Sequence, residues 1–310
     1  MNFSDRVKRV KPSFTLEMTS RAAELRAKGV AVINFSVGEP DFNTPDHIIR
    51  AGKEAMDNGF TKYTAGSGMI ELREAICEKL KRDNELYCDP NQVLVSNGEK
   101  QSLFTACQVL FQKGDEVIIF SPYWVSFPEF VRLADAEPII VKTDPNNQFE
   151  PDFDDLQLKI TNKTKGVIIN SPSNPTGGVW SEEAIIKILE MSAQNNWTVI
   201  SDECYEQLVF DGKFVSTQKL NSYKTNVLTC MSLSKTYAMT GWRIGYTLGH
   251  AEVIAGMSKL QGQSTSCPNS IAQQAAIEAL TGDQSSVSNM CSAFKKRSDL
   301  ILAQLSAISN

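Results

Sequence analysis

The chain is organised around the segment Val227-Leu-Thr-Cys-Met-Ser-Leu-Ser-Lys-Thr-Tyr-Ala-Met-Thr-Gly-Trp-Arg-Ile-Gly245. Its first four residues form an apolar run, which predicts a buried strand. A single lysine, Lys235, follows this strand among hydroxyl and small side chains. A lysine amine held just beyond a strand end is well placed to form a Schiff base with a carbonyl compound. The segment therefore predicts amine chemistry at a strand end, against the plainer alternative of a surface lysine in a loop.

Two further side chains of this segment indicate what the carbonyl compound carries. Ser232 and Arg243 combine a hydroxyl donor with a planar guanidinium, and such a pair suits phosphate oxygens. Gly241 and Gly245 leave room for a close approach of the backbone. An aldehyde on a phosphate tether describes pyridoxal 5′-phosphate (PLP), so the segment predicts a PLP site.

The composition excludes several other classes of protein. The 310 residues carry a net charge of −5 and are 42% hydrophobic, which suits one large globular domain or two. The mild acidity and the lack of a basic stripe argue against a nucleic-acid partner. No apolar run approaches the roughly 18 residues of a membrane span. Seven cysteines without CxxC pairs favour reduced thiols over disulfides or zinc, so we expect a cytoplasmic protein with no metal site.

Short apolar runs alternate with helical patterns along the chain. The predicted strands are 30–35, 93–95, 117–120, 138–141, 166–170, 197–202, 227–230 and 244–248. The predicted helices are 15–29, 45–58, 70–83, 103–110, 181–195, a stretch from 251, and 269–280 with a continuation to residue 310. This alternation predicts an α/β fold with a mostly parallel sheet covered by helices.

Three strand ends carry polar motifs. Asp202 ends an apolar strand, where an unpaired carboxylate is costly, and a protonated pyridine nitrogen would supply the missing cation. The stretch 171–177, rich in proline, follows another strand, and open α/β sheets bind ligands at such ends. Gly98 joins a third strand to a helix, whose N-terminus attracts anions. Each motif alone is common, and a plain turn or a strand that happens to end in Asp explains it equally well.

Together and in this order, the motifs resemble those of the class I/II aminotransferases. The resemblance covers nearly the whole chain and is greatest to the prokaryotic-type aspartate aminotransferases, the aspartate/prephenate subgroup. It implies the PLP-dependent transferase fold type I, with a large PLP-binding domain over 46–285. Residues 1–45 and 286–310 would then belong to a small domain that is incomplete here.

The resemblance also implies roles for individual residues. Lys235, Asp202 and Tyr205 would be catalytic. The cofactor would be held by Gly98, Glu99, Lys100, Trp124, Asn174, Asp202, Tyr205, Ser232, Lys235, Arg243 and Tyr63. The substrate would be met by Gly38, Trp124, Asn174, Lys100 and Thr15. Tyr63 would cross to the phosphate of a partner subunit, which implies a homodimer with shared active sites.

The implied reaction is transamination between an amino acid, expected to be aspartate, and a 2-oxo acid such as 2-oxoglutarate or oxaloacetate. Lys100 would meet the distal carboxylate of the substrate. The motif Lys11–Thr15 with Lys100 also resembles members that accept prephenate, and other amino acids remain an alternative. A further alternative is a PLP-binding protein without turnover. Family members continue for several dozen residues and carry there the arginine that clamps the α-carboxylate, so we expect this chain to bind cofactor with poor turnover.

Overall fold

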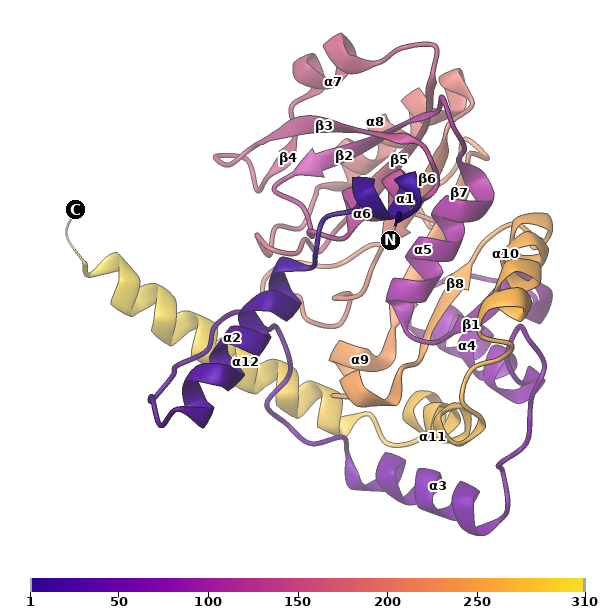
Figure 1. The fold of residues 1–310 in the computed structure, drawn as a ribbon, viewed down its shortest axis with the longest axis vertical. Coiled ribbons are helices and arrows are strands. Elements are labelled where there is room, and N and C mark those ends of the chain that lie inside the picture. The colour runs from indigo at the N-terminus through magenta and orange to yellow at the C-terminus, as the bar shows by residue number, and fades with distance from the viewer. Residues whose placement is uncertain (1, 309–310) are drawn as a thin grey trace.

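The computed structural model describes residues 2–308 and contains one eight-stranded sheet with helices around it (Figure 1). The strands are β1 (Val93–Ser96), β2 (Glu116–Ser121), β3 (Glu137–Asp144), β4 (Glu150–Pro151), β5 (Thr164–Asn170), β6 (Thr198–Asp202), β7 (Asn226–Ser232) and β8 (Gly245–Leu248). Their order across the sheet is β1-β8-β7-β6-β5-β2-β3-β4.

Twelve α-helices and two short 3-10 helices surround the strands in the described part of the chain. The α-helices are α1 (Asp5–Arg9), α2 (Phe14–Ala27), α3 (Asp46–Asp57), α4 (Ile70–Asn84), α5 (Glu99–Leu110), α6 (Phe127–Leu133), α7 (Phe153–Lys159), α8 (Glu182–Asn195), α9 (Leu233–Thr236), α10 (Ala251–Ser264), α11 (Ser270–Thr281) and α12 (Ser285–Ser306). The 3-10 helices are η1 (Pro90–Gln92) and η2 (Thr240–Trp242).

The sheet is mostly parallel, which confirms the predicted fold class. Strands β7, β6, β5, β2 and β3 pair in parallel, whereas β8 is antiparallel to both β7 and β1. Because β8 is reversed between them, β1 runs in the same direction as β7. The short β4 is antiparallel to β3. The carboxyl ends of β1, β2, β5, β6 and β7 therefore lie along one edge of the sheet.

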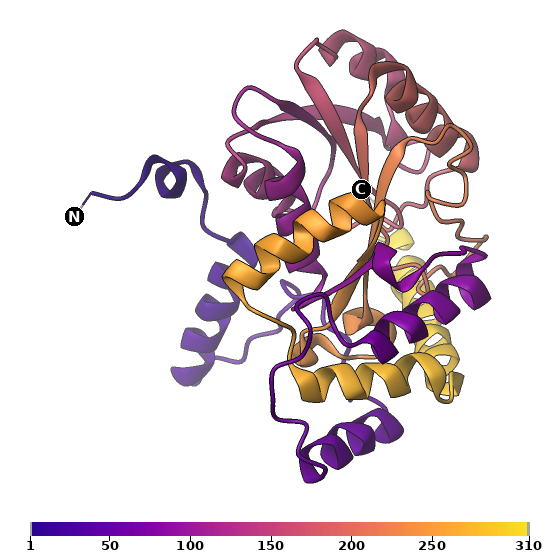
Figure 2. The same ribbon diagram turned by 90° about the vertical axis from the view of Figure 1, so that its right-hand side faces the viewer.

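The strands have apolar side chains on both faces, as expected of a sheet covered by helices on both sides. Figure 2 shows helices on either side of the strands. One face packs against α5, α6 and α10 and includes Ile119, Ile168, Ile200 and Leu228. The opposite face packs against α8 through Ile118, Val167, Val199 and Val227. It continues over β1 and β8 toward α3, α4 and α11, through Val95 and Tyr246 among others.

One predicted strand is wrong. Residues 30–35 form no strand, and the side chains of Ile33 and Phe35 are 84% and 91% exposed. A strand is stabilised by the ladder that it forms with a neighbour, and none of the eight strands pairs with this segment. The chain instead folds back on the end of α2, where the Val30 N–H donates to the Leu25 carbonyl at 3.0 Å.

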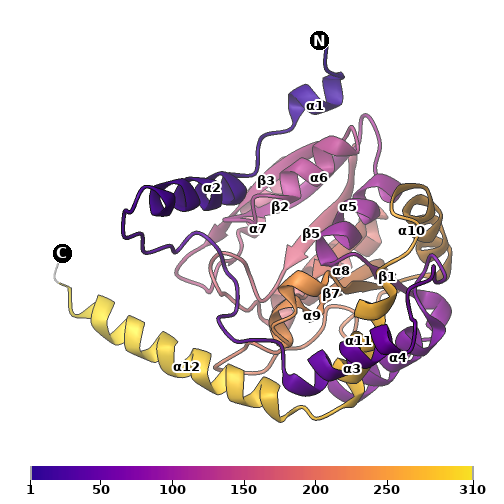
Figure 3. The same cartoon turned by 60° about the horizontal axis from the view of Figure 1, so that its bottom comes forward.

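The last described helix, α12, extends away from the sheet (Figure 3). It ends at Ser306, and residues 309–310 of the predicted helix lie outside the described part of the chain. Arg297 of α12 forms an ion pair with Asp41 at 2.7 Å and lies over the ring of Phe42. The ring of Phe42 in turn meets that of Phe294 edge to face at 5.4 Å. These contacts join α12 to the loop that begins at Gly38. No helix within residues 2–308 is long and apolar enough to cross a bilayer.

Candidate active site

Strand register brings the predicted site residues to one edge of the sheet. Asp202 at the end of β6 is paired with Asn170 of β5 on one side and with Cys230 of β7 on the other. Ser232, which ends β7, is opposite Gly245, where β8 begins. The loops after β1, β5, β6 and β7, and the turn before β8, therefore converge at this edge.

Lys235 lies in the one-turn helix α9, immediately after β7. Ser232 caps this helix, because its hydroxyl accepts a hydrogen bond from the Ser234 N–H at 3.0 Å. The half-buried Lys235 ammonium donates to the Gly38 carbonyl at 2.6 Å. The structure thus brings the predicted Schiff-base lysine and the predicted substrate-loop glycine into contact, although 197 residues separate them.

Gly98 and Arg243 form a cradle at the N-terminus of α5. Gly98 caps this helix with φ +84°, and a Cβ atom there would fall 2.2 Å from Nη2 of Arg243. Arg243 adopts the left-handed conformation with φ 58°, and its Nη1 donates to the Thr240 carbonyl at 2.8 Å. The guanidinium therefore lies against the positive end of the α5 dipole, and the two together form an anion site.

Asp202 is buried, with 5% of its surface exposed. Burial raises the pKa of its carboxyl group to about 6, although the Cys204 N–H donates to it at 3.2 Å and favours the anion. Among the described residues no cation forms an ion pair with it. The carboxylate is thus suited to a cation from outside the chain, as the sequence predicted for a pyridine nitrogen.

Asn174 and Tyr205 lie beside each other, with 3.5 Å between the Asn174 amide nitrogen and the Tyr205 hydroxyl. Burial raises the pKa of Tyr205, so the phenol keeps its proton and remains a donor at neutral pH. Asn170 accepts a hydrogen bond from the Asn174 N–H at 2.7 Å and donates to the Asp202 carbonyl at 3.2 Å. The sequence analysis missed Asn170, although its place at the end of a buried strand was a signal.

Trp124 packs edge to face against Phe127 and Phe130, with ring centroids 5.5 and 5.9 Å apart. The Lys100 ammonium lies 5.1 Å from the centroid of the Trp124 ring. Partial desolvation and the nearby Arg243 lower the pKa of Lys100, although much of its side chain is exposed. An anion placed next to this lysine would relieve both effects.

Two predicted site residues are not brought to this edge by any hydrogen bond within residues 2–308. Tyr63 lies in the loop between α3 and α4 with 89% of its side chain exposed. Thr15 lies in α2, where its carbonyl accepts from the Thr19 hydroxyl at 2.8 Å. Their predicted roles remain predictions.

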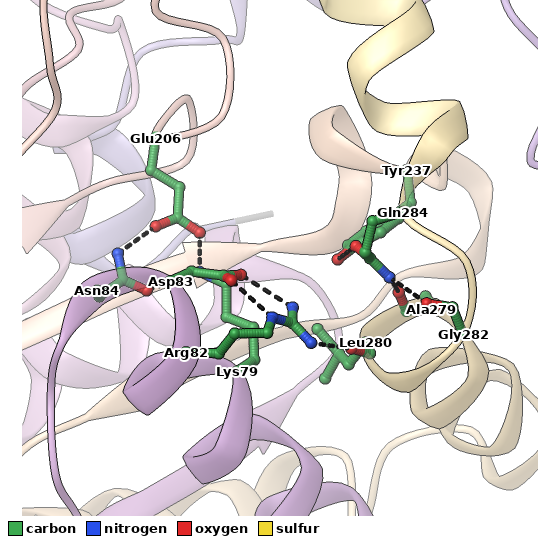
Figure 4. Close-up of polar contacts among 10 residues, drawn as sticks. All are labelled: Lys79, Arg82, Asp83, Asn84, Glu206, Tyr237, Ala279, Leu280, Gly282 and Gln284. Atoms are coloured by element: carbon green, nitrogen blue, oxygen red, sulfur yellow. Dashed lines mark hydrogen bonds and ion pairs between the residues drawn. The ribbon is translucent and has the colours of Figure 1, made fainter.

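Two separate clusters of polar contacts hold site loops against α4 and against the end of α11 (Figure 4). Glu206, next to Tyr205, pairs with Lys79 and accepts from the Asn84 amide at 2.6 Å. Tyr237, just after α9, donates to Gln284 at 2.9 Å. The loop after β6, which carries Tyr205, and the end of α9, the helix that carries Lys235, are therefore anchored by polar contacts to neighbouring elements.

The arrangement fits PLP on the observations above. The cradle at Gly98 would receive the phosphate, and the ring nitrogen would supply Asp202 with the cation that no described residue provides. Asn174 and Tyr205 offer donors for a phenolic oxygen, and Lys235 offers an amine for the aldehyde. No group of three or more His, Cys, Asp or Glu side chains in the described residues is placed to hold a metal ion.

Comparisons with known proteins agree with this geometry. The sequence profile of the family "Aminotransferase class I and II" matches residues 30–310. An aspartate aminotransferase from Bacillus sp. (strain YM-2) is 45% identical over 307 residues, which are 98% of this chain and 78% of the relative. An aspartate/prephenate aminotransferase from Thermus thermophilus is 42% identical over 98% of this chain and 80% of its own length.

Solved structures of aspartate aminotransferases also superpose on this chain. The aspartate aminotransferase from Thermus thermophilus with maleate superposes with a TM-score of 0.96 at 41% identity, over 99% of this chain and 81% of that one. The aspartate aminotransferase from Rhizobium meliloti has a TM-score of 0.94 at 38% identity, over 99% and 78% of the two chains. On the evidence of sequence and fold, the chain belongs to the class I and II aminotransferases, which use pyridoxal 5′-phosphate as cofactor.

Proposed function

We propose that the protein transfers an amino group between aspartate and a 2-oxo acid, 2-oxoglutarate or oxaloacetate, with PLP held on Lys235. The observation that carries the proposal is that Lys235 and Asp202 lie at the same edge of the sheet. Lys235 is a half-buried amine, and Asp202 is a buried carboxylate that forms no ion pair within residues 2–308. The names of the relatives support aspartate as the amino donor. They give no support to the alternative of a PLP-binding protein without turnover.

Different residues at the sheet edge would bind the phosphate and the ring of the cofactor. Ser232, Arg243 and the backbone of Gly98, Glu99 and Lys100 would hold the phosphate, where a helix N-terminus and a guanidinium already meet. Trp124 would pack on the ring face. When bound, PLP supplies an electron sink for the electrons released at the substrate Cα.

The other side chains control protons. Asp202 would keep the ring nitrogen protonated, because an anion beside it favours the charged form. Asn174 and Tyr205 would donate to the phenolic oxygen. The Lys235 amine would take the proton from the substrate Cα and deliver it to C4′ of the cofactor, first as general base and then as general acid. The Gly38 carbonyl accepts a hydrogen bond from Lys235 in this structure. It would face the substrate when the Lys235 amine leaves it to transfer the proton.

Substrate choice rests on Lys100. Its ammonium is partly desolvated beside Arg243, so a distal carboxylate gains a charge-assisted hydrogen bond there. The relative with the highest TM-score quoted above was solved with maleate, a dicarboxylate. Prephenate is a second candidate substrate, because a 42% identical relative is named for it. Thr15, in the motif 11–15, would then take part in the substrate site.

We further propose a homodimer with shared active sites, in which Tyr63 reaches the phosphate of a partner. The 89% exposure of Tyr63 supports this, because the side chain is free to reach another chain. A large domain over 46–285 with a small domain from 1–45 and 286–310 is supported by the ion pair between Asp41 and Arg297. A cytoplasmic location is supported by seven free cysteines.

The attachment of PLP to Lys235 tests the proposal directly. Borohydride reduction of the protein loaded with PLP, followed by peptide mass spectrometry, is expected to find the pyridoxyl group on Lys235. Mixing the loaded protein with a panel of amino acids and following the cofactor spectrum in single turnover is expected to show the fastest conversion with aspartate. A label on another lysine would refute the attachment, and equal rates for all amino acids would refute the substrate.

A further inference from the structure

Glu99 carries a carboxyl group that the proposed cofactor contacts do not use. It is the first residue of α5 and is 93% enclosed, since only 7% of its surface is exposed. Its Oε1 atom is fully buried and has no hydrogen-bond donor among the described residues. A buried carboxylate with one oxygen left unpaired is costly, so the side chain needs either a proton or a cation.

The surroundings of Glu99 are mostly acidic or neutral. The carboxyl group of Asp202 and the thiol of Cys204 both lie within hydrogen-bonding reach of the Glu99 carboxyl group. The other ionisable groups around it are Glu203 and Tyr205 from the loop after β6, Cys230 from β7 and Tyr246 from β8. Two cations lie nearby. The Arg243 guanidinium lies against the neighbouring Gly98, and the charge of Lys235 offsets part of the rise that burial causes in the pKa of the Cys204 thiol.

Two buried carboxyl groups in contact cannot both be ionised, because like charges at hydrogen-bonding distance repel strongly in a site shielded from water. At neutral pH the pair therefore holds one proton. Burial and the neighbouring Asp202 raise the pKa of Glu99 well above its usual value. Burial also raises the pKa of Asp202, but the hydrogen bonds from the Cys204 N–H and from Glu99 offset part of that rise. The dipole of α5 favours the opposite arrangement, but a helix terminus contributes less than the burial of an unpaired charge costs. The proton thus belongs to Glu99.

We propose that Glu99 is a positioning residue for the cofactor: its protonated carboxyl group donates a hydrogen bond to Asp202 and holds that carboxylate toward the pyridine nitrogen. This inference deepens the proposed function and rests on the role given there to Asp202. The pair carries a single negative charge, which matches the single positive charge of a protonated ring nitrogen. Asp202 is then held from two sides, by Glu99 and by the Cys204 N–H.

The test is a double-mutant cycle on the binding of PLP to the apoprotein. The variants are Glu99→Ala, Glu99→Gln, Asp202→Ala and the double variant Glu99→Ala/Asp202→Ala, and PLP affinity is measured by absorbance titration. Glu99→Ala is expected to weaken binding roughly tenfold or more, since a hydrogen bond to a charged group is lost. Glu99→Gln keeps a donor and is expected to stay within about threefold of the wild type. In the Asp202→Ala background, Glu99→Ala is expected to have no further effect.

The outcomes separate this inference from the proposed function. Unchanged PLP affinity in Asp202→Ala contradicts the proposed role of Asp202 itself. A loss in Asp202→Ala with none in Glu99→Ala overturns the positioning role of Glu99 alone. An equal loss from Glu99→Ala in both backgrounds, or an equal loss in Glu99→Gln, shows a purely structural effect and also overturns it.

An infrared measurement keeps the inference testable if Glu99→Ala does not fold. The carbonyl stretch of a protonated carboxyl group is distinct from that of a carboxylate, and the difference spectrum of wild type minus Glu99→Gln isolates the Glu99 group. A protonated band at neutral pH is expected. A carboxylate band in its place contradicts the proposal.

Discussion

Lys100 contributes to the candidate site through its backbone and, separately, through its side chain. Its backbone lies in the first turn of α5, where N–H groups are free to bind phosphate, and its ammonium extends over Trp124. Its lowered pKa arises mainly from desolvation, and a distal carboxylate would offset that cost. The side chain and the backbone of this residue therefore make separable contributions.

The side chain can be tested by substrate comparison. Lys100→Ala is expected to lower the single-turnover rate with aspartate by on the order of 10- to 100-fold, because a charge-assisted hydrogen bond of about 1.5–3 kcal/mol is lost. Alanine has no distal carboxylate and serves as the matched control, with little change expected. Equal losses with the two amino acids would mean that only the Lys100 backbone matters.

At the scale of elements, the junction between β1 and α5 explains the need for glycine at one position. Gly98 combines a positive φ with the close approach of Arg243, so both backbone conformation and space exclude a side chain. Gly114 has a similar φ of +97° with nothing within 4 Å of a Cβ atom. The two glycines therefore separate the effect of strain from the effect of crowding.

Replacing each of these glycines by alanine tests whether the cradle formed by Gly98 and Arg243 binds the phosphate. Gly98→Ala is expected to weaken PLP binding by roughly tenfold or more, because the Cβ atom displaces Arg243 from the helix N-terminus. Gly114→Ala carries a comparable strain of about 1–2 kcal/mol in folding and is expected to leave PLP affinity unchanged. Affinity is read by absorbance titration, and stability by urea unfolding. A similar PLP affinity for the two variants would count against the cradle as the phosphate site.

Elements also show what the sequence could predict. The apolar runs that became β1, β5, β6 and β7 are buried among helices, so hydrophobicity alone predicted them. The polar residues at the ends of these strands predicted most of the candidate site, and the roles of these residues remain predictions. The run 30–35 is equally apolar but has no neighbouring strand, and pairing over long distances is invisible in a local pattern. The side chain of Glu99 was overlooked for the same reason, because its contact with Asp202 joins elements that lie far apart in sequence.

At the scale of the whole molecule, burial of acidic groups links stability to pH. Burial raises the pKa of Glu203 to about 7, from a usual value of 4.5. Its Oε1 accepts from the Ser201 hydroxyl and the Thr217 N–H, both at 3.0 Å. Asp202, whose pKa burial raises to about 6, adds a dependence of the same sign.

The pH dependence of unfolding follows from these shifts. The folded state holds the Glu203 proton more tightly than the unfolded state, so its contribution is full below about pH 4.5 and is lost as the pH rises to about 7. The loss is on the order of 3 kcal/mol. Glu203→Gln is expected to flatten this dependence, as measured by urea unfolding of the apoprotein at about pH 5 and about pH 8. An identical change in unfolding free energy for the variant and the wild type would contradict the assignment.

The proposed dimer makes a prediction at the same scale. Sedimentation of the PLP-loaded chain is expected to give a dimer, and Tyr63→Phe is expected to weaken PLP binding by roughly two- to tenfold, because one hydrogen bond to the phosphate is lost. Tyr87→Phe is the matched control, since this tyrosine is also largely exposed, at 81%. A monomer that binds PLP, or equal affinities for the two variants, would rule out the shared site.

The antiparallel direction of β8 determines where Lys235 and Arg243 lie relative to the sheet edge. Because this strand runs against β7, the chain leaves the sheet at Ser232 and returns to the same edge at Gly245, directly opposite. Lys235 and Arg243 both lie on this short excursion, one near each end. The proposed covalent anchor and the proposed phosphate anchor are thus both placed at this edge by the pairing of β7 with β8. A fold in which β7 and β8 pair therefore positions both residues together, and neither proposed anchor reaches the sheet edge without the other.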